Sequence, residues 1–319
     1  MPKLEYRYEP INFEIPLPCV PDAAVDSRGR IFCMTDGNPE PIVVFDQQGK
    51  VLYSWGTGVI KGCHGIFIDE NDYIYVADSG DHTVKKFAAD AGHALLMTLG
   101  NPGVPSDTGA IKGNFKTIQR GAGPFYSPSK VSVSPNSEIF VSDGYGNSRV
   151  HRFSTDGELL ASWGEPGGGP GEFRIVHGVG VTQDGRVYVA DRENNRVQIF
   201  DVTGKLLDIW NGINRPDGLC VANNMVYVAE LGHIFYVDNV MYEPYENMPW
   251  SRVRVFDLDG NELACFGGAD PAVPGNMWSA HSINVDSEGS IYVGEAGWPE
   301  SEQPKPVNLH AALQKFVLV

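Results

Sequence analysis

The amino-acid sequence predicts an all-β fold, a β-propeller built from six four-stranded blades. Three observations support this prediction. Apolar and polar residues alternate with a period of two on either side of short polar turns, a pattern typical of antiparallel strands. One strand-rich unit recurs along the 319 residues, and the 37 glycines and 22 prolines favour a turn-rich β protein. We expect one domain over residues 1–319, because this length can bury a sizeable core.

The repeating unit is clearest between Ile175 and Phe200. A histidine is followed by a small apolar run, Gly178–Val181, and then by an Asp-Gly turn. Two alternating segments follow, at Arg186–Asp191 and Arg196–Phe200. Alternation around an Asp-Gly turn indicates antiparallel hairpins, so the unit is predicted to form three consecutive strands. The segment that continues to Trp210 adds a fourth.

Six copies of this unit can be aligned on the acid that ends each second strand. These acids are Asp36, Asp78, Asp143, Asp191, Glu230 and Glu295. The equivalent starts of the first strands are Asp22, His64, Ser129, His177, Asp217 and His281. A closed arrangement of six such sheets buries both faces of every blade and protects the strand edges. An open solenoid of the same units is the alternative, and it would expose two long β edges.

The two ends of the chain are predicted to meet in the sixth blade. The sixth unit ends at Val319 after its third strand, so Tyr6–Ile15 is expected to supply the missing outer strand. The arm could pair within its own chain or with a neighbouring copy. Two long spacings between units mark insertions at about 101–125 and 232–250. The second insertion is acidic and rich in aromatic residues, and it could be a lid or a structured loop.

Composition excludes several classes of partner. A net charge of −16 argues against nucleic acid and anionic membranes, which both attract basic proteins. No apolar run approaches the ~20 residues of a membrane span, and the N-terminus lacks the apolar core of a signal peptide, so we expect a cytoplasmic protein. Five cysteines without paired spacing indicate neither a disulfide framework nor a cysteine zinc site.

Three histidines share one register of the repeat. His64, His177 and His281 start the first strands of blades two, four and six. The first strands line the central channel of a propeller, so three imidazoles from alternate blades are predicted to converge on its axis. Three histidines with an open fourth position are typical of catalytic zinc, and imidazole also suits other divalent transition metals. Channel-lining polar residues satisfied by water are the alternative. The other five histidines lack this register and are expected on the surface or in packing.

Two further residues are predicted at the same end of the blades. Tyr145 follows Asp143 by two residues, and Arg192 follows Asp191 directly, so both leave second strands on short loops. Such loops commonly carry function. A tyrosine can act as a base near a cation, and an arginine can hold a carboxylate through two hydrogen bonds. A packed loop aromatic and a surface ion pair are the simpler interpretations of the two residues.

The blades resemble NHL repeats, and VSDGYGNSRVHRF and HGVGVTQDGRVYVADRENNRVQIF are similar to the catalytic core of peptidyl-α-hydroxyglycine α-amidating lyases. The likeness covers roughly residues 22–200 and 280–316. It implies a six-bladed propeller in which His64, His177 and His281 hold zinc. It further implies that Tyr145 is the base and that Arg192 binds substrate or tunes the tyrosine. Members of that family split an α-hydroxyglycine amide into an amide and glyoxylate.

The chain departs from that family at three positions. A second active-site arginine of the family is Met34 here, the aspartate of its calcium site is Ser282, and the cysteine after its tyrosine is Gly146. The resemblance therefore does not carry over the calcium ion. The loss of an arginine leads us to expect a substrate less anionic than a peptidyl-α-hydroxyglycine.

The sequence thus predicts a zinc-dependent lyase that cleaves a carbinolamide or hemiaminal C–N bond in a small or peptide-derived molecule. A metal-dependent hydrolase or lactonase on the same site is the competing enzyme class, and a non-catalytic NHL scaffold that binds proteins is a third reading. The oligomeric state is left open. If the lyase reading holds, Tyr145→Phe and Arg192→Ala are expected to lower turnover while leaving fold and metal content intact.

Overall fold

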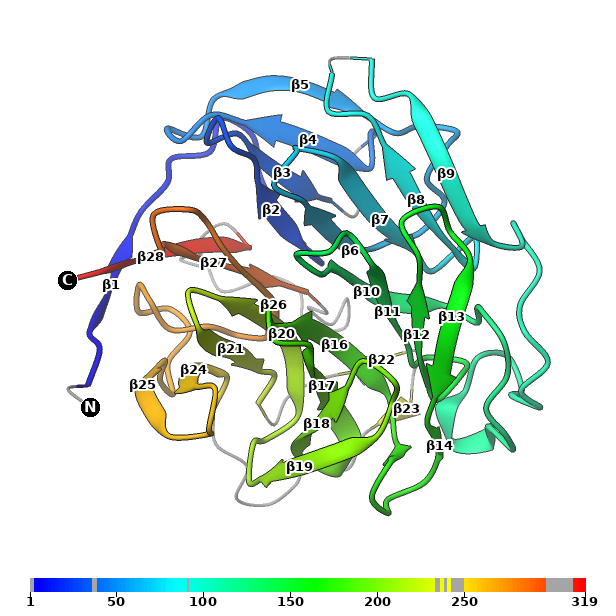
Figure 1. Cartoon of the computed structure of the whole chain (residues 1–319). Coiled ribbons are helices and arrows are strands. Elements are labelled where there is room, and N and C mark those ends of the chain that lie inside the picture. The colour runs from blue at the N-terminus through cyan, green and yellow to red at the C-terminus, as the bar shows by residue number, and fades with distance from the viewer. Residues whose placement is uncertain are drawn as a thin grey trace. The chain divides into compact units, whose positions relative to one another are not determined.

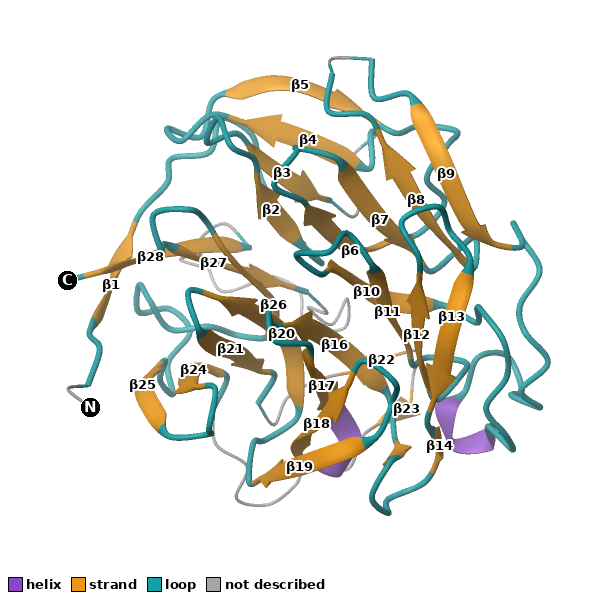
Figure 2. Ribbon diagram, in the orientation of Figure 1, coloured by secondary structure: helices purple, strands orange, loops and turns teal. Residues whose placement is uncertain are grey.

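Strands dominate the computed structural model, which describes residues 3–35, 39–90, 92–232, 236–237, 240–241, 250–296 and 312–319. The helices in the part described are two short 3₁₀ turns, η1 (Phe115–Thr117) and η2 (Arg192–Asn194), drawn in purple in Figure 2. In these ranges, no helix is long and apolar enough to cross a membrane. The predicted all-β composition is confirmed.

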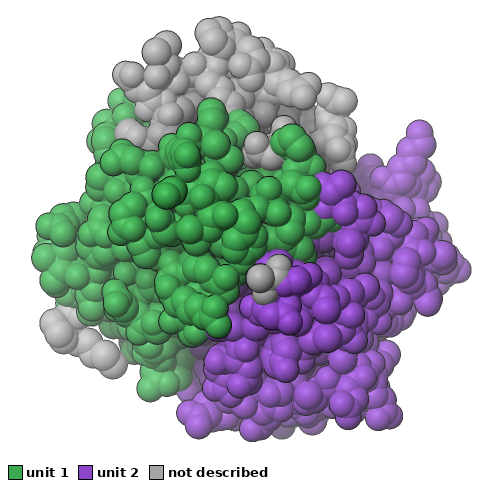
Figure 3. Space-filling model, turned by 90° about the horizontal axis from the view of Figure 1, so that it is seen from above, with its two compact units in different colours: residues 1–56, 222–319 green, residues 57–221 purple. Residues whose placement is uncertain are grey.

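The chain divides into two compact units, coloured separately in Figure 3. One unit comprises residues 1–56 and 222–319, and the other comprises residues 57–221. The single domain expected from the sequence stays a prediction.

Three four-stranded sheets of unit 57–221 follow one another along the chain, as the labels in Figure 1 show. The first is β6 (Cys63–Ile68), β7 (Ile74–Asp78), β8 (Thr83–Phe87) and β9 (Leu95–Gly100). The second is β10 (Pro128–Val133), β11 (Ile139–Asp143), β12 (Arg149–Phe153) and β13 (Leu159–Trp163). The third is β16 (Val176–Val181), β17 (Arg186–Asp191), β18 (Arg196–Asp201) and β19 (Leu206–Asn211). A short parallel pair, β14 (Glu165–Pro166) and β15 (Glu172–Phe173), precedes the third sheet.

Three more four-stranded sheets complete the fold. The N-terminal one is β2 (Ala23–Val25), β3 (Ile31–Met34), β4 (Ile42–Phe45) and β5 (Val51–Trp55). The next is β20 (Pro216–Ala222), β21 (Met225–Glu230), β24 (Arg252–Asp257) and β25 (Glu262–Phe266). The last is β26 (Ala280–Val285), β27 (Ile291–Glu295), β28 (Leu313–Leu318) and β1 (Tyr6–Glu9). A short hairpin, β22 (Tyr236–Val237) with β23 (Val240–Met241), lies within the second insertion. These six sheets are the blades of the predicted β-propeller.

The N-terminal arm supplies the outer strand of the sixth blade, as predicted, but over fewer residues. Strand β1 pairs antiparallel with β28, with Tyr6 opposite Leu318 and Glu9 opposite Lys315. The strand ends at Glu9 rather than Ile15, because Pro10 has no N–H to donate to a ladder. The residues beyond it pack instead on the first blade, where the Phe13 ring lies edge-on to Phe45 at 5.0 Å between centroids.

The hydrophobic core of unit 57–221 lies between neighbouring sheets. Val141 of β11 and Tyr75 of β7 belong to one cluster, and Phe140 of β11 and Val189 of β17 belong to another. Because both faces of a middle strand are covered, β7 is buried at every position rather than at alternate ones. This double burial fixes each sheet against its neighbours and holds the ends of the inner strands in place.

In four of the blades, the acid that ends the second strand accepts a hydrogen bond from the backbone of the loop before the first strand. Asp78 accepts a hydrogen bond from the Gly62 N–H (2.8 Å), and Asp191 accepts one from the Arg174 N–H (2.8 Å). Burial raises the pKa of Asp191 to about 6, so this carboxyl group is ionised at neutral pH. The equivalent acid of the first blade, Asp36, lies outside the described residues.

Candidate active site

The three histidines lie at irregularities in the first strands of their blades. In β6, Cys63 pairs with Asp78 and Gly65 with Ala77, so His64 is an extra, bulged residue. His281 is bulged in the same way in β26, and the register of β16 shifts across His177. A β-bulge bends the strand and re-aims the side chain at that position. The shared register predicted from the sequence therefore reflects a shared local geometry.

A backbone carbonyl fixes the tautomer of each histidine. In all three, the Nδ1–H group donates to the carbonyl of a residue at or beside the start of another first strand. The pairs are His64 with Ser129 (2.7 Å), His177 with Asp217 (3.1 Å) and His281 with Pro21 (2.7 Å). A carbonyl can only accept, so Nδ1 carries the proton and Nε2 keeps its lone pair. This arrangement is typical of metal-binding histidines, whose second nitrogen is held by a hydrogen bond.

The histidines are divided between the two compact units. His64 and His177 belong to unit 57–221, whereas His281 belongs to the other unit. Convergence of all three on one point stays a prediction.

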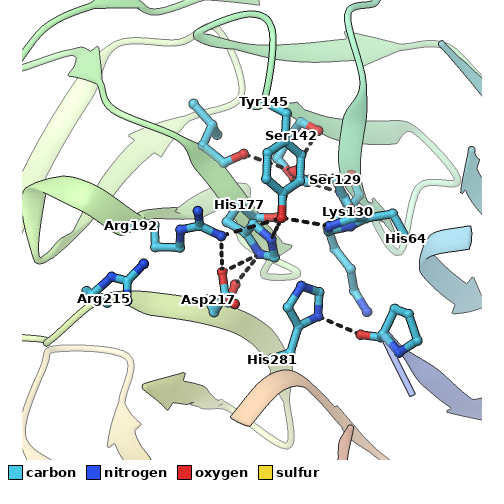
Figure 4. A network of polar contacts seen from close by, with 12 residues as sticks. His64, Ser129, Lys130, Ser142, Tyr145, His177, Arg192, Arg215, Asp217 and His281 are labelled. Carbon is cyan, nitrogen blue, oxygen red and sulfur yellow. Dashed lines mark hydrogen bonds and ion pairs between the residues drawn. The ribbon is translucent and has the colours of Figure 1, made fainter. Parts of the chain in front are cut away.

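Within unit 57–221, the structure brings Tyr145 together with His64 and His177 (Figure 4). The Tyr145 hydroxyl lies 2.9 Å from Nε2 of His64 and 2.9 Å from Nε2 of His177. With both Nδ1 atoms protonated, two acceptor nitrogens face one hydroxyl that carries a single proton. The hydroxyl can donate to only one of the two Nε2 atoms, so the other Nε2 lone pair faces the hydroxyl oxygen without a hydrogen between them. A cation or an additional proton at this point would remove that repulsion.

Two glycines allow the loop that carries Tyr145 to pack closely. A Cβ atom at Gly144 would lie 2.1 Å from the Val176 carbonyl oxygen, and one at Gly146 would lie 2.3 Å from the Tyr126 ring. The Gly146 N–H also donates to the Tyr126 carbonyl (3.0 Å). The glycine at position 146, where the family resembled has a cysteine, is thus required here because the Tyr126 ring occupies the space of a side chain.

Arg192 is fully buried, in contrast to the surface ion pair weighed from the sequence. It is the first residue of η2, and its N–H donates to the Ile175 carbonyl (3.1 Å). Its Nε donates to Glu193 (2.9 Å), and its Nη1 donates to Asp217 (3.1 Å) and lies 3.4 Å from the Tyr145 hydroxyl. The guanidinium carbon lies 5.6 Å from the centroid of the Tyr145 ring. Arg192 therefore places a positive charge beside the phenol.

Asp217 joins the arginine to the histidine. Its Oδ1 atom lies 2.8 Å from Nδ1 of His177 and 3.1 Å from Nη1 of Arg192. Asp217 occupies in β20 the position that histidine holds in β16, and this equivalence is visible in the sequence. Its function as a carboxylate partner of His177 was not predicted.

A second buried arginine lies behind Arg192. Arg215 donates through Nη2 to Glu193 (2.9 Å), and Glu193 also accepts from Arg192. The backbone of Arg215 has a positive φ of 42°, and its N–H donates to the Asn195 side chain (2.8 Å). Sequence reasoning missed both Glu193 and Arg215. Glu193 follows Arg192 directly and could have been considered as its partner, whereas nothing in the repeat pattern marks Arg215.

Two serine hydroxyls hold the strand ends that carry the histidines. Ser129, whose carbonyl orients His64, donates through its hydroxyl to the Val176 carbonyl (2.9 Å). Ser142 donates to the His177 carbonyl (3.0 Å), and the two hydroxyls are 3.0 Å apart. These contacts fix the spacing of His64 and His177, and they too were not foreseen.

The remaining histidines that can be described are packing residues. His151 is buried between Asp143 (3.3 Å) and Ser162 (2.9 Å). His82 accepts a hydrogen bond from the Ser127 N–H (3.1 Å), and burial lowers the pKa of its imidazole. His93 is buried as well. His233 and His310 lie outside the described residues, as does most of the second insertion, where a lid was considered.

Two positions where the sequence differs from the amidating-lyase motif are buried in the unit formed by residues 1–56 and 222–319. Met34 ends β3 and has no exposed surface, and Ser282 lies beside His281 in β26 with 5% of its surface exposed. The Met34 side chain brings no charge to this place.

Comparison with known proteins assigns the chain to a family. The NHL repeat model matches residues 125–153 and 173–200. NHL repeat-containing protein 3 from Homo sapiens is 29% identical over 303 residues, which is 89% of this chain and 79% of that protein. The probable peptidyl-α-hydroxyglycine α-amidating lyase from Caenorhabditis elegans is 34% identical over 265 residues, which is 81% of this chain and 68% of that protein. Among solved structures, a streptogramin B lyase aligns with a TM-score of 0.62 and 13% identity, over 98% of each chain.

The fold and the named relatives together define an NHL-repeat β-propeller of an enzyme family. More particularly, the chain belongs to the peptidyl-α-hydroxyglycine α-amidating lyase family, which confirms the resemblance inferred from the sequence.

Proposed function

We propose that the protein is a metal-dependent lyase that cleaves the C–N bond of a carbinolamide and releases an amide and an aldehyde. The observation that carries the proposal is the approach of two imidazole Nε2 atoms to the Tyr145 hydroxyl, each at 2.9 Å. Both imidazoles have their Nδ1 proton committed to a backbone carbonyl, so both offer a lone pair at the same place.

The donor set fits a divalent transition metal, with zinc as the expected ion. His281 has the same bulged position and the same kind of Nδ1 hydrogen bond as the other two histidines, and we propose it as the third ligand. Three neutral imidazoles suit zinc, and they leave a coordination position open. When bound, such an ion supplies Lewis-acid activation of a substrate hydroxyl. No calcium ion is part of the proposal.

Tyr145 is the proposed general base. It would take the proton of the substrate hydroxyl, and the electrons of that O–H bond would form the carbonyl of the aldehyde as the C–N bond breaks. The amide nitrogen gains a proton, so no oxidant or reductant is required. The positive charge of Arg192, 3.4 Å from the phenol oxygen, stabilises the phenolate form. A positioned general base typically contributes about 10²–10⁴-fold in rate.

Asp217 is the proposed positioning residue. Its carboxylate, shared between His177 and Arg192, would orient the imidazole and keep the guanidinium beside Tyr145. Carboxylate partners of metal-binding histidines typically alter metal affinity or activity by about 10–100-fold when they are removed.

Product analysis in ¹⁸O-labelled water tests the reaction class. A carbinolamide such as N-acetyl-α-hydroxyglycinamide is converted under single-turnover conditions, and the products are trapped at once and analysed by mass spectrometry. The proposal predicts an amide without ¹⁸O. Acetate that carries ¹⁸O, formed in place of acetamide, would support a hydrolase that attacks the acyl carbonyl instead. No turnover, together with a metal-free protein, would support a binding scaffold.

A further inference from the structure

We infer that the first insertion, which joins β9 to β10, holds the loop of Tyr145 in place, and that Thr108 is the positioning residue within it. The inference rests on the proposed function, in which Tyr145 is the general base. It follows from hydrogen bonds between the insertion and the two residues that come after Tyr145, which are Gly146 and Asn147.

Both backbone polar groups of Gly146 are held by this segment. The hydroxyl of the buried Thr108 donates to the Gly146 carbonyl at 2.6 Å. The Gly146 N–H donates to the backbone carbonyl of Tyr126, the first residue after the insertion, at 3.0 Å. Because the backbone has only two soft dihedral angles per residue, fixing the peptide groups beside Tyr145 restricts the direction in which its side chain leaves the loop.

Asn147 forms a reciprocal pair with Ala122 of the insertion. Its side-chain oxygen accepts from the Ala122 N–H at 3.1 Å, and its side-chain nitrogen donates to the Ala122 carbonyl at 3.2 Å. The same nitrogen donates to Asp143, the last residue of β11, at 2.8 Å. Asn147 has no exposed surface, so water does not compete for these hydrogen bonds. The loop between β11 and β12 is therefore bonded to the insertion at two successive residues.

Thr108 is held in turn by the rest of the insertion. Its hydroxyl accepts from the Ala110 N–H at 3.2 Å, and its carbonyl accepts from the Gln119 N–H at 3.0 Å. A hydroxyl group has one proton, and the approach of the Ala110 N–H directs that proton toward the Gly146 carbonyl. Residues 101–125 lie outside the repeat, so the blades by themselves do not supply these contacts.

Tyr145 needs this support because its proposed role depends on distance. Its hydroxyl lies 2.9 Å from Nε2 of His64 and 2.9 Å from Nε2 of His177, and both contacts must be kept at once. Displacement of a catalytic group by ~1 Å can cost about 10²-fold in rate. Loss of the Thr108 hydroxyl would release the Gly146 carbonyl and let the phenol move away from the reacting atoms.

Thr108→Val keeps the shape of the side chain and removes the hydroxyl group. We expect kcat for N-acetyl-α-hydroxyglycinamide to fall by about 10–100-fold, while KM changes by less than about threefold and the metal content is unchanged. Thr108→Ser restores the hydroxyl and should restore kcat to within about threefold of the wild type. A Thr108→Val protein with wild-type kcat, or a Thr108→Ser protein as slow as Thr108→Val, would overturn the inference and leave the lyase proposal intact.

Thr117→Val is the matched control in the same insertion. The Thr117 hydroxyl accepts from the Ile111 N–H at 2.8 Å and donates to the Asn114 carbonyl at 2.6 Å, so both of these partners lie within the insertion. The control loses the same kinds of hydrogen bond as Thr108→Val, and we expect its kcat to stay within about twofold of the wild type. An equal fall of kcat in both variants would indicate a general loss of structure and would contradict the positioning role.

Amide hydrogen exchange at Gly146, followed by NMR, gives a readout that does not depend on turnover. In the wild type, we expect this amide to exchange at least about 10²-fold more slowly than in an unstructured peptide, because its N–H is bonded to the Tyr126 carbonyl. Exchange should be about tenfold faster in Thr108→Val and unchanged in Thr117→Val. Unprotected exchange in the wild type would overturn the inference even if Thr108→Val fails to fold.

Thr108→Val in the Tyr145→Phe background separates failure of this inference from failure of the proposed function. If Thr108 acts through the phenol, the second substitution should lower kcat by less than about twofold once the phenol hydroxyl is absent. A further fall of about tenfold would indicate an effect unrelated to Tyr145, and it would overturn the inference alone. Full activity in Tyr145→Phe itself would contradict the proposed general base and, with it, this inference.

Discussion

A backbone carbonyl lies within hydrogen-bond distance of Nδ1 in each of His64, His177 and His281, and the Asp217 carboxylate also faces Nδ1 of His177. Because the carbonyl only accepts, it holds the proton on Nδ1 and leaves Nε2 as an acceptor. Tyr145 faces two of these acceptors with one hydroxyl proton. The chemistry proposed for the site therefore depends on single atoms, and it can be tested one atom at a time.

Tyr145→Phe removes only the hydroxyl group. We expect turnover to fall by about 10²–10⁴-fold, as for the loss of a general base, with unchanged metal content and melting temperature. The checks are steady-state kinetics, elemental analysis and thermal unfolding. Tyr126→Phe is the matched control, since Tyr126 packs under the same loop. Full activity in Tyr145→Phe would remove the phenol from the mechanism.

The burial of Arg192 changes the expected effect of Arg192→Ala on the stability of the fold. The sequence alone suggested an intact fold, but the substitution leaves Glu193 and Asp217 buried without this partner. Breaking a buried ion pair typically costs about 3–5 kcal/mol in the free energy of unfolding. Arg186→Ala, in an exposed pair with Asp184, should cost ~1 kcal/mol or less. Urea unfolding measures both, and equal stabilities would show that the buried pairs contribute little.

Much of the site can be predicted from the sequence because the repeat places the residues. The register predicts equivalent positions for the histidines, and the second strands end at the loops that carry Tyr145 and Arg192. The ion pairs around Arg192 could not be predicted from the repeat. Glu193, Arg215 and Asp217 come together through packing between β17, η2 and β20, and no period in the sequence encodes these pairings. The bulges at the histidines also escape pattern reasoning, because one extra residue does not disturb the alternation visibly.

At the scale of elements, the N-terminal arm joins several sheets of its own unit. The Leu4 N–H donates to the carbonyl of Leu263 in β25 (2.8 Å), Tyr6–Glu9 pairs with β28, and Phe13 packs on β4. The sequence predicted the destination of the arm from the missing outer strand. It did not predict the end of the strand at Glu9, although Pro10 offered the clue.

Deleting residues 1–16 should destabilise the protein strongly. The truncation exposes the edge of β28 and removes Ile11, Phe13 and Ile15 from the first blade. Each apolar side chain contributes at most ~1.5–3 kcal/mol, so a fall in melting temperature on the order of 10 °C is expected. Differential scanning calorimetry and light scattering measure the loss of stability and any aggregation. Deleting only residues 1–3 is the control, and a truncated protein as stable as this control would show that the arm is dispensable.

At the scale of the whole molecule, the three proposed metal ligands are divided between the two compact units. His64 and His177 come from residues 57–221, and His281 comes from the other unit. A ligand that binds only the folded protein stabilises it in proportion to the logarithm of its concentration over its dissociation constant. Metal shared by all three histidines should therefore stabilise the chain as a whole, whereas the blades themselves should remain folded without it.

The metal content of the wild type and of three single variants, His64→Ala, His177→Ala and His281→Ala, tests the central claim most directly. The proteins are purified in parallel without chelators and analysed by inductively coupled plasma mass spectrometry, with His151→Ala as the control outside the site. The account predicts about one zinc per chain in the wild type and the control, and a loss of tight binding in each of the three variants. A metal-free wild type, or a variant among the three that keeps both its zinc and its activity, would contradict it.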